Sequence, residues 1–391
     1  MKYVSIQKLV EHGHVAIKTG PFGTQLKASE YVSHGTPVLN VRNLGFATVN
    51  TEKLEMIGAE TVERLSAHKL MTGDIVFGRK GAVERHGFIS TDENGWMQGS
   101  DCIRLRVLTD AVNPRFLSYY FLTRRHKAFM ISMCSHGTTM ASLNQKIIEK
   151  IEVPLPERLI QDKIVGLLSI FDKRIAINQK INKNLEQQAQ AIFKSWFIDF
   201  EPFDNRKPSD WSVSMLGNVS IMGAGGDKPR SVSQIKTDLY KFPIYSNGLS
   251  NEGLYGFTDK PKIIEESVTV SARGTIGFVC LRHIPYVPIV RLVTLIPKAE
   301  IISAKYLYLW LKQLHITGTG TTQQQLTVPD FQKTEILVPS QEIVTLFTAT
   351  VEPIFEKIWA NQNENEKLAS LRDTLLPKLM SGELDVSNLD F

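Results

Sequence analysis

The sequence predicts an α+β protein in which two α/β domains are separated by two long helices, paired as an antiparallel coiled coil and related by an internal duplication. The main observation is a repeat: shifted by 183 residues, segment 137–197 aligns without a gap on segment 320–380, and thirteen of the 61 pairs are identical. Ordinary residue frequencies would give about three or four. Each copy follows short β-rich runs and continues into an apolar stripe with heptad spacing. A repeat of this length indicates a duplicated domain unit, and hence a pseudo-twofold molecule.

Length and composition allow two or three domains, each with its own core. The chain has 391 residues, of which 42% are apolar and 22% charged, values typical of globular proteins. No stretch reaches the apolar length of a membrane span, and the N-terminal residues lack the apolar core of a signal peptide. Cys102, Cys134 and Cys280 are odd in number and far apart, which argues against a disulfide framework or a zinc cluster. We therefore expect a cytoplasmic protein with no membrane partner.

The net charge of +5 is unevenly distributed. Residues 1–156 and 201–339 together carry +8, whereas residues 340–391 carry −5. A positive bias in two places fits attraction to phosphate groups, but an ordinary solvated surface would show the same bias. Charge alone leaves both interpretations open.

Four consecutive segments account for the chain. In the first, runs such as 37–41 (PVLNV) and 74–77 (DIVF) are rich in strand formers and bounded by turn residues, and the third repeats this texture. The second and fourth are helical because their apolar residues recur with heptad spacing. The predicted segments are domain 1 (1–155), helix 1 (156–200), domain 2 (201–338), and helix 2 with a C-terminal tail (339–391).

The two helical segments predict a helix pair. Each stripe is sustained over about four heptads, and an antiparallel arrangement would bury one stripe against the other. A helix of about 38 residues would be about 57 Å long. The residues predicted at the interface are Ile164, Leu168, Phe171, Ile175, Asn178, Leu185, Phe347, Val351, Ile354, Ile358, Asn361 and Leu368.

Polar residues and a proline interrupt these stripes. Asn178 and Asn361 occupy equivalent places near the middle, so a buried amide pair would fix the register of the helices; alternatively, both face solvent. Pro353 stands where the first copy has Ile170. It must kink the second helix or delay its start to that point.

No constellation of catalytic groups is evident in the sequence. The chain lacks a GxxxxGK[ST] phosphate loop, and residues 223–226 (GAGG) lack the strand–helix context of a cofactor loop. It also lacks the aromatic-proline signature of an amino-methyltransferase and the spaced carboxylates and lysine of a metal-dependent nuclease. His12 and His14 form a pair without a third ligand nearby. We therefore predict a binding module with no catalytic residue and no metal site.

Motifs in a repeated order carry a family resemblance. Residues 18–26 (KTGPFGTQL) and 37–43 (PVLNVRN) stand in the first half, and residues 243–248 (PIYSNG) and 271–277 (SARGTIG) in the second. Each half closes with a Gly-Thr-Thr turn, a proline-bearing link and the long helix. The two turns are Gly137-Thr138-Thr139 and Gly320-Thr321-Thr322. In this order, and over almost the whole chain, the sequence resembles the specificity subunit of type I DNA restriction-modification systems.

The resemblance implies a function and a set of partners. In that family, two target-recognition domains each read one half of an asymmetric, interrupted sequence in double-stranded DNA, and the helix pair sets the gap. The resemblance implies that the helices bind two methyltransferase subunits and that restriction subunits join through the complex. It further implies a non-catalytic subunit without its own cofactor, since the partner subunits would use S-adenosylmethionine, ATP and magnesium. A coil longer than one DNA turn of about 34–36 Å agrees with a spacer.

The predicted DNA contacts lie beside glycines or in turns, where the backbone can approach DNA closely. The alternative for each residue is that it caps a turn or satisfies buried backbone. The two Gly-Thr-Thr turns could hold phosphate, or could dock each domain on its helix. The predicted contacts are Lys18, Gln25, Asn40, Arg42, Asn43, Arg79, Lys80, Lys228, Arg230, Ser246, Asn247 and Arg273.

Two rival functions stay open at this point. A nuclease or methyltransferase with a diverged site would require clustered carboxylates or a nucleotide loop. A coiled-coil scaffold, whose domains bind other proteins, would not require DNA at all. Salt-sensitive binding to duplex DNA separates the scaffold from a specificity subunit, because neutralising phosphates releases counterions.

Overall fold

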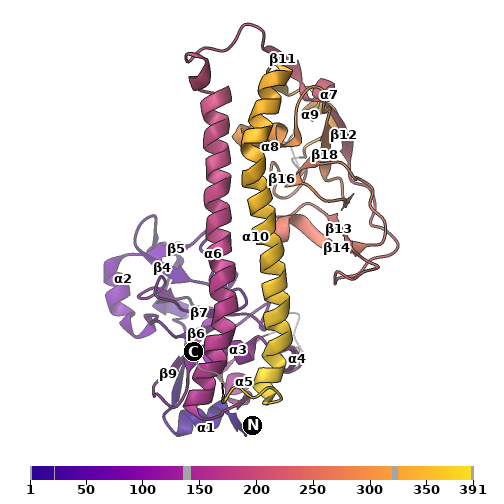
Figure 1. Cartoon of the computed structure of the whole chain (residues 1–391). Helices are drawn as coiled ribbons and strands as arrows, with labels where there is room; N and C mark the ends of the chain where they lie inside the picture. Colours follow the sequence, from indigo (N-terminus) through magenta and orange to yellow (C-terminus); the bar gives the residue numbers. More distant parts are fainter. Residues whose placement is uncertain (1, 22, 135–141, 319–324, 389–391) are drawn as a thin grey trace. The chain divides into compact units, whose positions relative to one another are not determined.

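The structure is a computed structural model that describes residues 2–21, 23–134, 142–318 and 325–388 (Figure 1). It divides into two compact units. Unit 1 comprises Met1–Ile177 with Glu364–Phe391, and unit 2 comprises Asn178–Asn363. Both Gly-Thr-Thr turns, at 137–139 and 320–322, lie outside the described residues.

Unit 1 contains mixed helices and strands, together with residues 158–177 of α6 (Arg158–Phe197) and residues 364–381 of α10 (Gln341–Ser381). Its strands are β1 (Tyr3–Ser5), β2 (Val15–Thr19), β3 (Tyr31–Val32), β4 (Thr36–Leu39), β5 (Glu55–Ile57), β6 (Ile75–Gly78), β7 (His86–Phe88), β8 (Met97–Gln98), β9 (Cys102–Val107) and β10 (Glu152–Pro154). Its shorter helices are α1 (Ile6–Glu11), α2 (Ala59–Arg64), α3 (Pro114–Phe121), α4 (Arg124–Cys134) and α5 (Gln145–Glu149), with 3-10 turns at Gly23–Gln25, Ala28–Glu30, Val41–Asn43 and Ser66–His68.

Three sheets build unit 1. The main sheet has the order β2-β9-β6-β7, and each neighbouring pair is antiparallel. A second sheet has the order β3-β5-β4-β8, in which β4 and β8 are parallel, and β1 pairs with β10. All four residues of β6 are buried, as expected for a run of apolar strand formers covered on both faces. Helix α3 follows the main sheet; it begins where the Asn113 side chain accepts hydrogen bonds from two backbone N–H groups and Pro114 fills the first turn.

Unit 2 contains residues 178–197 of α6 and residues 341–363 of α10. Its strands are β11 (Ser212–Met215), β12 (Ser220–Ala224), β13 (Phe242–Tyr245), β14 (Leu254–Thr258), β15 (Ser267–Val270), β16 (Val279–Arg282), β17 (Val287–Pro288), β18 (Val293–Pro297) and β19 (Glu335–Val338). Its shorter helices are α7 (Leu216–Val219), α8 (Ala304–Gln313) and α9 (Val328–Phe331), with 3-10 turns at Glu201–Phe203 and Ser250–Gly253.

The strands of unit 2 pair in the same order as those of unit 1. The main sheet is β12-β18-β15-β16, with antiparallel neighbours throughout. The second sheet is β14-β13-β17, in which β13 and β17 are parallel, and β11 pairs with β19. Helix α8 follows the main sheet, as α3 does in unit 1. In place of the two-residue strand β3 of unit 1, the second sheet of unit 2 has an isolated antiparallel bridge between Ser233 and Phe257 of β14.

The long helices contribute directly to the core of each unit. In unit 1, Leu168 of α6 and Leu379 of α10 are buried in the same cluster as Phe116 of α3. In unit 2, Phe193 of α6 and Phe347 of α10 lie with ring centroids 5.9 Å apart, in a cluster that includes the sheet residues. In both units, therefore, the domain and the helix segments share one apolar core.

The residues predicted at the helix-pair interface are all at least half-buried. Those that are buried are Ile164, Leu168, Asn178, Phe347, Val351, Ile358 and Asn361. Those that are half-buried are Phe171, Ile175, Leu185, Ile354 and Leu368.

The two predicted asparagines are buried. Asn178 and Asn361 are each 1% exposed, so the alternative that both face solvent is wrong. The Asn361 amide donates to Oδ1 of Asn182, one helical turn beyond Asn178, at 2.8 Å. Asn182 in turn donates to the carbonyl oxygen of Ile358 at 3.1 Å, so a third asparagine of the apolar stripe, which the heptad pattern did not single out, takes part in this polar layer.

Pro353 does not delay the start of the second helix. Helix α10 begins at Gln341 and is continuous through Pro353 to Ser381. Pro353 and Ala349, whose carbonyl loses its usual partner, are both exposed, so water can satisfy that oxygen. The expectation of a late start was therefore wrong.

Candidate nucleic-acid interface

The main and second sheets of unit 1 meet at a group of loops that we call the first loop cluster. It consists of residues 18–21, 39–43, 78–81 and 98–102. The N–H of Gly99 donates to the carbonyl of Leu39 at 2.9 Å, and the N–H of Gly20 donates to the carbonyl of Cys102 at 2.8 Å. A Cβ on Gly20 would lie 2.0 Å from the carbonyl oxygen of Gly99, so only glycine permits this approach.

Unit 2 has a second loop cluster, consisting of residues 225–228, 245–248, 271–274 and 289–292. Its backbone hydrogen bonds repeat those of the first: Ile289 N–H donates to the carbonyl of Tyr245 at 2.9 Å, and Gly225 N–H to that of Leu292 at 2.8 Å. A Cβ on Gly225 would lie 2.7 Å from backbone atoms of Ile289. Both clusters thus depend on a glycine at the same place in the sheet order.

The cations predicted to contact DNA in unit 1 lie in or near the first loop cluster. Lys18, on β2, and Arg79, after β6, are half-buried, whereas Lys80 is exposed. Arg42 forms an exposed ion pair with Glu55 at 3.0 Å. A phosphate could replace an exposed carboxylate partner of this kind at little cost, since such pairs contribute at most about 1 kcal/mol.

The predicted amide contacts of unit 1 have different surroundings. Gln25 is exposed, and the Asn40 amide donates to the Glu55 carboxylate at 2.7 Å. Asn43 is 1% exposed; its Oδ1 accepts from the backbone of Asn40, and its Nδ2 donates to two backbone carbonyls. Asn43 therefore stabilises a turn, and the structure leaves its side chain no surface to offer a ligand.

The predicted cations of unit 2 are all exposed. Lys228 and Arg230 lie in the segment after Gly226, and Arg273 donates to the Gln325 side chain at 2.8 Å. Ser246 is half-buried beside them, with its backbone N–H bonded to the carbonyl of Gly253. Three segments of the second loop cluster carry Lys228, Ser246 and Arg273, and Arg230 follows the first of these segments.

Asn247 joins the segments of the second loop cluster. Its Nδ2 donates to the carbonyl of Val290 at 2.7 Å, and its Oδ1 accepts from the N–H of Ala272 at 2.7 Å. The side chain predicted to contact DNA thus holds two backbone segments in place. The contacted turn at Val290 and Arg291 was missed, because the apolar run around it reads as a strand and carries no glycine or asparagine to mark a turn.

A charged network fastens α3 to the long helices in unit 1. The Asp172 carboxylate of α6 accepts from Arg115 at 2.9 Å, from the Tyr119 hydroxyl at 2.6 Å and from Arg372 of α10 at 2.8 Å. Burial by itself would raise the pKa of Asp172, but the hydrogen bonds from Tyr119 and Arg372 and the charge of Arg115 outweigh it and lower the pKa. The carboxylate is therefore ionised at neutral pH.

The equivalent network of unit 2 has a cation at its centre. The Lys305 ammonium of α8, with only 5% of its side chain exposed, lies 2.8 Å from Glu266 and 2.9 Å from Glu352 of α10. It also lies 5.3 Å from the ring centroid of Trp359. Arg115 and Lys305 both occupy the second position of the helix that follows the main sheet.

Two histidines are buried between the main sheet and helices α3 and α4 of unit 1. His86 is within 2.9 Å of the Ser118 hydroxyl, and the His126 ring lies 4.7 Å from that of Phe121. Burial lowers the pKa of His126 to about 3, and burial together with His126 and nearby cations lowers that of His86 well below its ordinary value. Both imidazoles are neutral at physiological pH and belong to the core.

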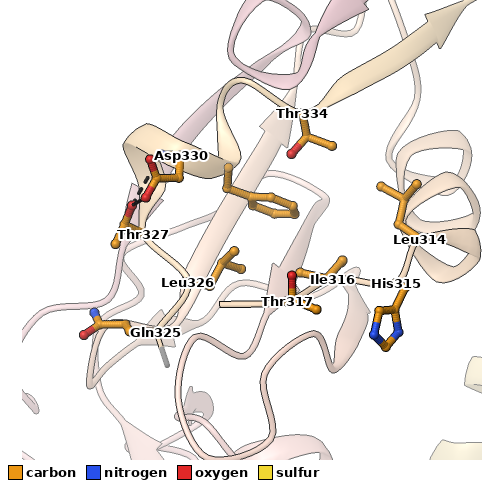
Figure 2. A pocket seen from close by; sticks show the side chains of 10 residues that line it. Leu314, His315, Ile316, Thr317, Gln325, Leu326, Thr327, Asp330 and Thr334 are labelled. Carbon is orange, nitrogen blue, oxygen red and sulfur yellow. Dashed lines mark hydrogen bonds between the residues drawn. The ribbon is translucent and has the colours of Figure 1, made fainter. Parts of the chain in front are cut away.

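A pocket of about 250 Å³ lies in unit 2 between the segment after α8 and the start of α9 (Figure 2). Its walls combine apolar residues, such as Ile316, Leu326 and Phe331, with polar ones, and the Thr327 hydroxyl donates to Asp330 at 2.6 Å on one side. Residues 319–324, which connect its two walls, lie outside the described residues. We therefore assign it no ligand.

The described part of the chain offers neither a metal-ligand cluster nor a membrane-spanning helix. Among residues 2–21, 23–134, 142–318 and 325–388, no three or more His, Cys, Asp or Glu side chains are grouped to hold a metal ion. No helix formed by these residues is both long and apolar enough to span a membrane.

Comparisons with known proteins identify the class. A model of the type I restriction modification DNA specificity domain matches the chain twice, over residues 37–187 and 208–369. The MjaIX specificity subunit of a type I restriction enzyme from Methanocaldococcus jannaschii is 27% identical, over 98% of this chain and 94% of its own. The HindI specificity subunit of Haemophilus influenzae is 25% identical, over 80% and 86%.

A solved structure shares the fold. The S subunit of a type I restriction-modification system from M. genitalium aligns over 97% of this chain and 96% of its own, with a TM-score of 0.54 and 17% identity. The sheets, the loop clusters and the double match define a protein with two DNA specificity domains in one chain. The chain belongs to the specificity-subunit family of type I restriction-modification systems.

Proposed function

We propose that this chain is the non-catalytic DNA-recognition subunit of a type I restriction-modification complex, in which each domain reads one half of an asymmetric, interrupted target. The first recognition domain is residues 1–155 and the second is residues 201–338. The observation that carries the proposal is the double match to a DNA specificity domain, together with two loop clusters built by the same hydrogen bonds.

The two halves arose, on this proposal, by internal duplication, and residues 156–200 and 339–391 form an antiparallel coiled coil. The identical pairing order of the sheets in the two units supports duplication. Within unit 2, α6 residues 182 and 193 contact α10 residues 361 and 347 respectively, and within unit 1, residues 172 and 174 contact residues 372 and 364. In each unit, the residue number on α10 falls as the residue number on α6 rises, as expected for two helices that run in opposite directions.

The proposed DNA surface consists of residues of the two loop clusters that are at least partly exposed, together with Gln25 and Arg230, which follow cluster segments in the sequence. The cations would bind phosphates and the amides would contact bases or sugars. Asn43 and Asn247 instead position the backbone. The proposed contacts are Lys18, Gln25, Asn40, Arg42, Arg79, Lys80, Lys228, Arg230, Ser246 and Arg273.

The helix pair would set the gap between the half-sites and bind two methyltransferase subunits, with restriction subunits joining through the complex. Exposed apolar residues on the helices, such as Ile170, Ile177 and Leu346, support a protein partner there. S-adenosylmethionine, ATP and magnesium would be held by the partner subunits, and the assembly would act in the cytoplasm.

The decisive experiment is to co-express the chain with its methyltransferase subunit and to map adenine methylation across the host genome. We expect methylation at one asymmetric, interrupted motif. Replacing residues 1–155 with the corresponding domain of a relative should change one half of that motif and leave the other half unchanged. Methylation without a bipartite motif would contradict the proposal.

The rival functions predict other results. A scaffold protein would assemble without salt-sensitive DNA binding, whereas a recognition subunit should lose affinity steeply as salt rises. A nuclease or methyltransferase would act on DNA as the isolated chain.

A further inference from the structure

The turn at residues 289–292 has an unusual sequence for its backbone. Val290 and Arg291 have φ angles of 52° and 60°, and Leu292 N–H donates to the carbonyl of Ile289 at 3.1 Å, the pattern of a type I′ turn. Such turns ordinarily carry Asn-Gly, because positive φ is unfavourable for other residues and most of all for β-branched ones. A Val-Arg pair is therefore held in a strained conformation.

The second loop cluster imposes this conformation. Val290 N–H donates to the carbonyl of Gly226 at 2.9 Å, and Arg291 N–H to that of Gly225 at 2.8 Å. On the other side, the Asn247 amide donates to the carbonyl of Val290. Neighbouring segments therefore bind three of the four polar backbone groups of Val290 and Arg291: both N–H groups and the Val290 carbonyl. Strain that the surroundings over-determine in this way is typical of binding sites.

The two side chains project from the turn into solvent. Val290 is 52% exposed, although exposing an apolar side chain at a tight turn contributes nothing to stability. Arg291 is exposed, and within the described part of the chain no hydrogen bond or ion pair engages its guanidinium. An apolar group and a guanidinium therefore stand side by side, next to the segments that carry Lys228 and Arg273.

The corresponding turn of unit 1 offers different chemistry. In the first loop cluster, Cys102 N–H donates to the carbonyl of Gly99 at 3.3 Å, so that Ser100 and Asp101 take the places of Val290 and Arg291. Neither of them has positive φ. Equivalent turns thus present a hydroxyl and a carboxylate in one unit, and an isopropyl group and a guanidinium in the other.

We propose that Val290 and Arg291 are base-reading residues of the second recognition domain, an inference that rests on the proposed function. The Arg291 guanidinium donates two hydrogen bonds to O6 and N7 of a guanine, and the Val290 methyl groups contact the methyl group of a neighbouring thymine. Arginine and small apolar groups are the side chains suited to these two features of the major groove. Asn247 is a positioning residue that fixes the turn which carries them.

The test uses the complex of the chain with its methyltransferase subunit, a wild-type motif and a library in which each base of that motif is varied. Arg291→Ala should lower the preference for guanine at one position of one half-site by about 5- to 150-fold, the range of a bidentate contact. Arg291→Lys keeps the positive charge and hence any attraction to phosphates, but it should not keep the preference for guanine, because lysine lacks the planar guanidinium fork. Arg206→Ala, which removes an exposed cation between α6 and β11, is the matched control for charge and should leave the motif unchanged.

A second variant separates recognition from folding. Val290→Gly with Arg291→Gly removes the strain, so the chain should melt at a higher temperature than the wild type while losing discrimination in one half-site only. An equal loss of affinity for all sequences with Arg291→Ala, restored by lysine, would show a phosphate contact and overturn the inference. An unchanged motif in both variants would overturn it as well, while leaving the proposed function intact. If the wild-type complex itself has no bipartite motif, the proposed function fails first.

Discussion

Unit 1 fastens helix α3, which follows its main sheet, to the long helices through a carboxylate, whereas unit 2 fastens the equivalent helix α8 to α10 through an ammonium group. In unit 1, the Asp172 carboxylate of α6 accepts hydrogen bonds from three side chains, two of which are arginines. In unit 2, Lys305 of α8 lies between Glu266 and Glu352. The position of the cation on the helix after the main sheet is the same, but the centre of the network has changed sign.

The difference shows which parts of the repeat are constrained. Backbone contacts that need a glycine, at Gly20 and Gly225, take the same form in both units. In a side-chain network the charges need only neutralise one another, so a central carboxylate and a central ammonium group can each join a domain helix to a long helix. The networks also differ in exposure: the centre of the unit 2 network has 5% of its side chain exposed, and that of unit 1 has 23%.

Removing the centre of the unit 2 network should have the largest effect. Lys305→Met leaves Glu266 and Glu352, each about a third exposed, without the buried cation that they share. It should lower the free energy of unfolding by about 3 kcal/mol, at the low end for a buried pair because water partly solvates the carboxylates. Chemical denaturation measures this change. Lys312→Met, on the same helix, is the matched control and should cost less than 1 kcal/mol. If the two variants lost equal stability, burial would not be the reason for the difference between the units.

Removing the centre of the unit 1 network should cost less. Asp172→Asn keeps an acceptor for the Tyr119 hydroxyl, Arg372 retains its ion pair with Asp373, and Arg115 retains its contacts with two aromatic rings. We expect a loss of about 1–2 kcal/mol in the same denaturation assay. A loss larger than that of Lys305→Met would reverse the comparison. Asp373→Asn, at an exposed position, serves as the control.

Acid should distinguish the units with a smaller effect. The folded pKa of His126, about 3, lies below its unfolded value of about 6.5, so protons bind preferentially to the unfolded state between these limits and stability falls as the pH falls through them. At pH 5.5 His126 should already cost about 1.4 kcal/mol relative to high pH. In unit 2, burial lowers the pKa of His283 to about 4, so unit 2 contributes one such histidine, whereas unit 1 contributes His86 as well as His126.

Hydrogen exchange resolved by peptide measures this difference. Between pH 7 and pH 5.5, amides of unit 1 should lose more protection than amides of unit 2, after correction for the intrinsic rate. His126→Phe keeps a ring against Phe121 and should reduce the loss. Equal losses in the two units would exclude the buried histidines as the cause.

The sequence predicted the elements with strong periodicity and missed those that neighbouring segments impose. The heptad stripes placed both long helices, observed at Arg158–Phe197 and Gln341–Ser381, because apolar spacing directly reflects the buried face of a helix. The stripes also predicted burial of Asn178 and Asn361, but not the hydrogen bond from Asn361 to Asn182. The alternative in which Pro353 delays the start of the second helix was wrong, since a proline on an exposed helix face removes one hydrogen bond without ending the helix.

The sequence predicted which glycine-bearing segments form loops, whereas contact of these residues with DNA stays a prediction. Glycine-bearing motifs placed the loop clusters, because close backbone approach requires glycine. The roles of Asn43 and Asn247 did not follow from sequence, since an amide suits a base and a backbone group equally well. The Val290–Arg291 turn was missed because Gly225, Gly226 and Asn247, 43 or more residues away in the chain, impose its conformation.

Unit 1 is discontinuous in the sequence, and this sets the order in which the molecule can be completed during synthesis. Residues 364–391 supply Leu376, Leu379, Met380 and Val386 to the core of unit 1, whereas all of unit 2 lies between Asn178 and Asn363. The ribosome therefore delivers every residue of unit 2 before the last strip of the unit 1 core exists. Unit 1, although its residues 1–177 are translated before unit 2, is completed after it, and a ribosome that stalls before residue 376 leaves the core of unit 1 without these apolar side chains.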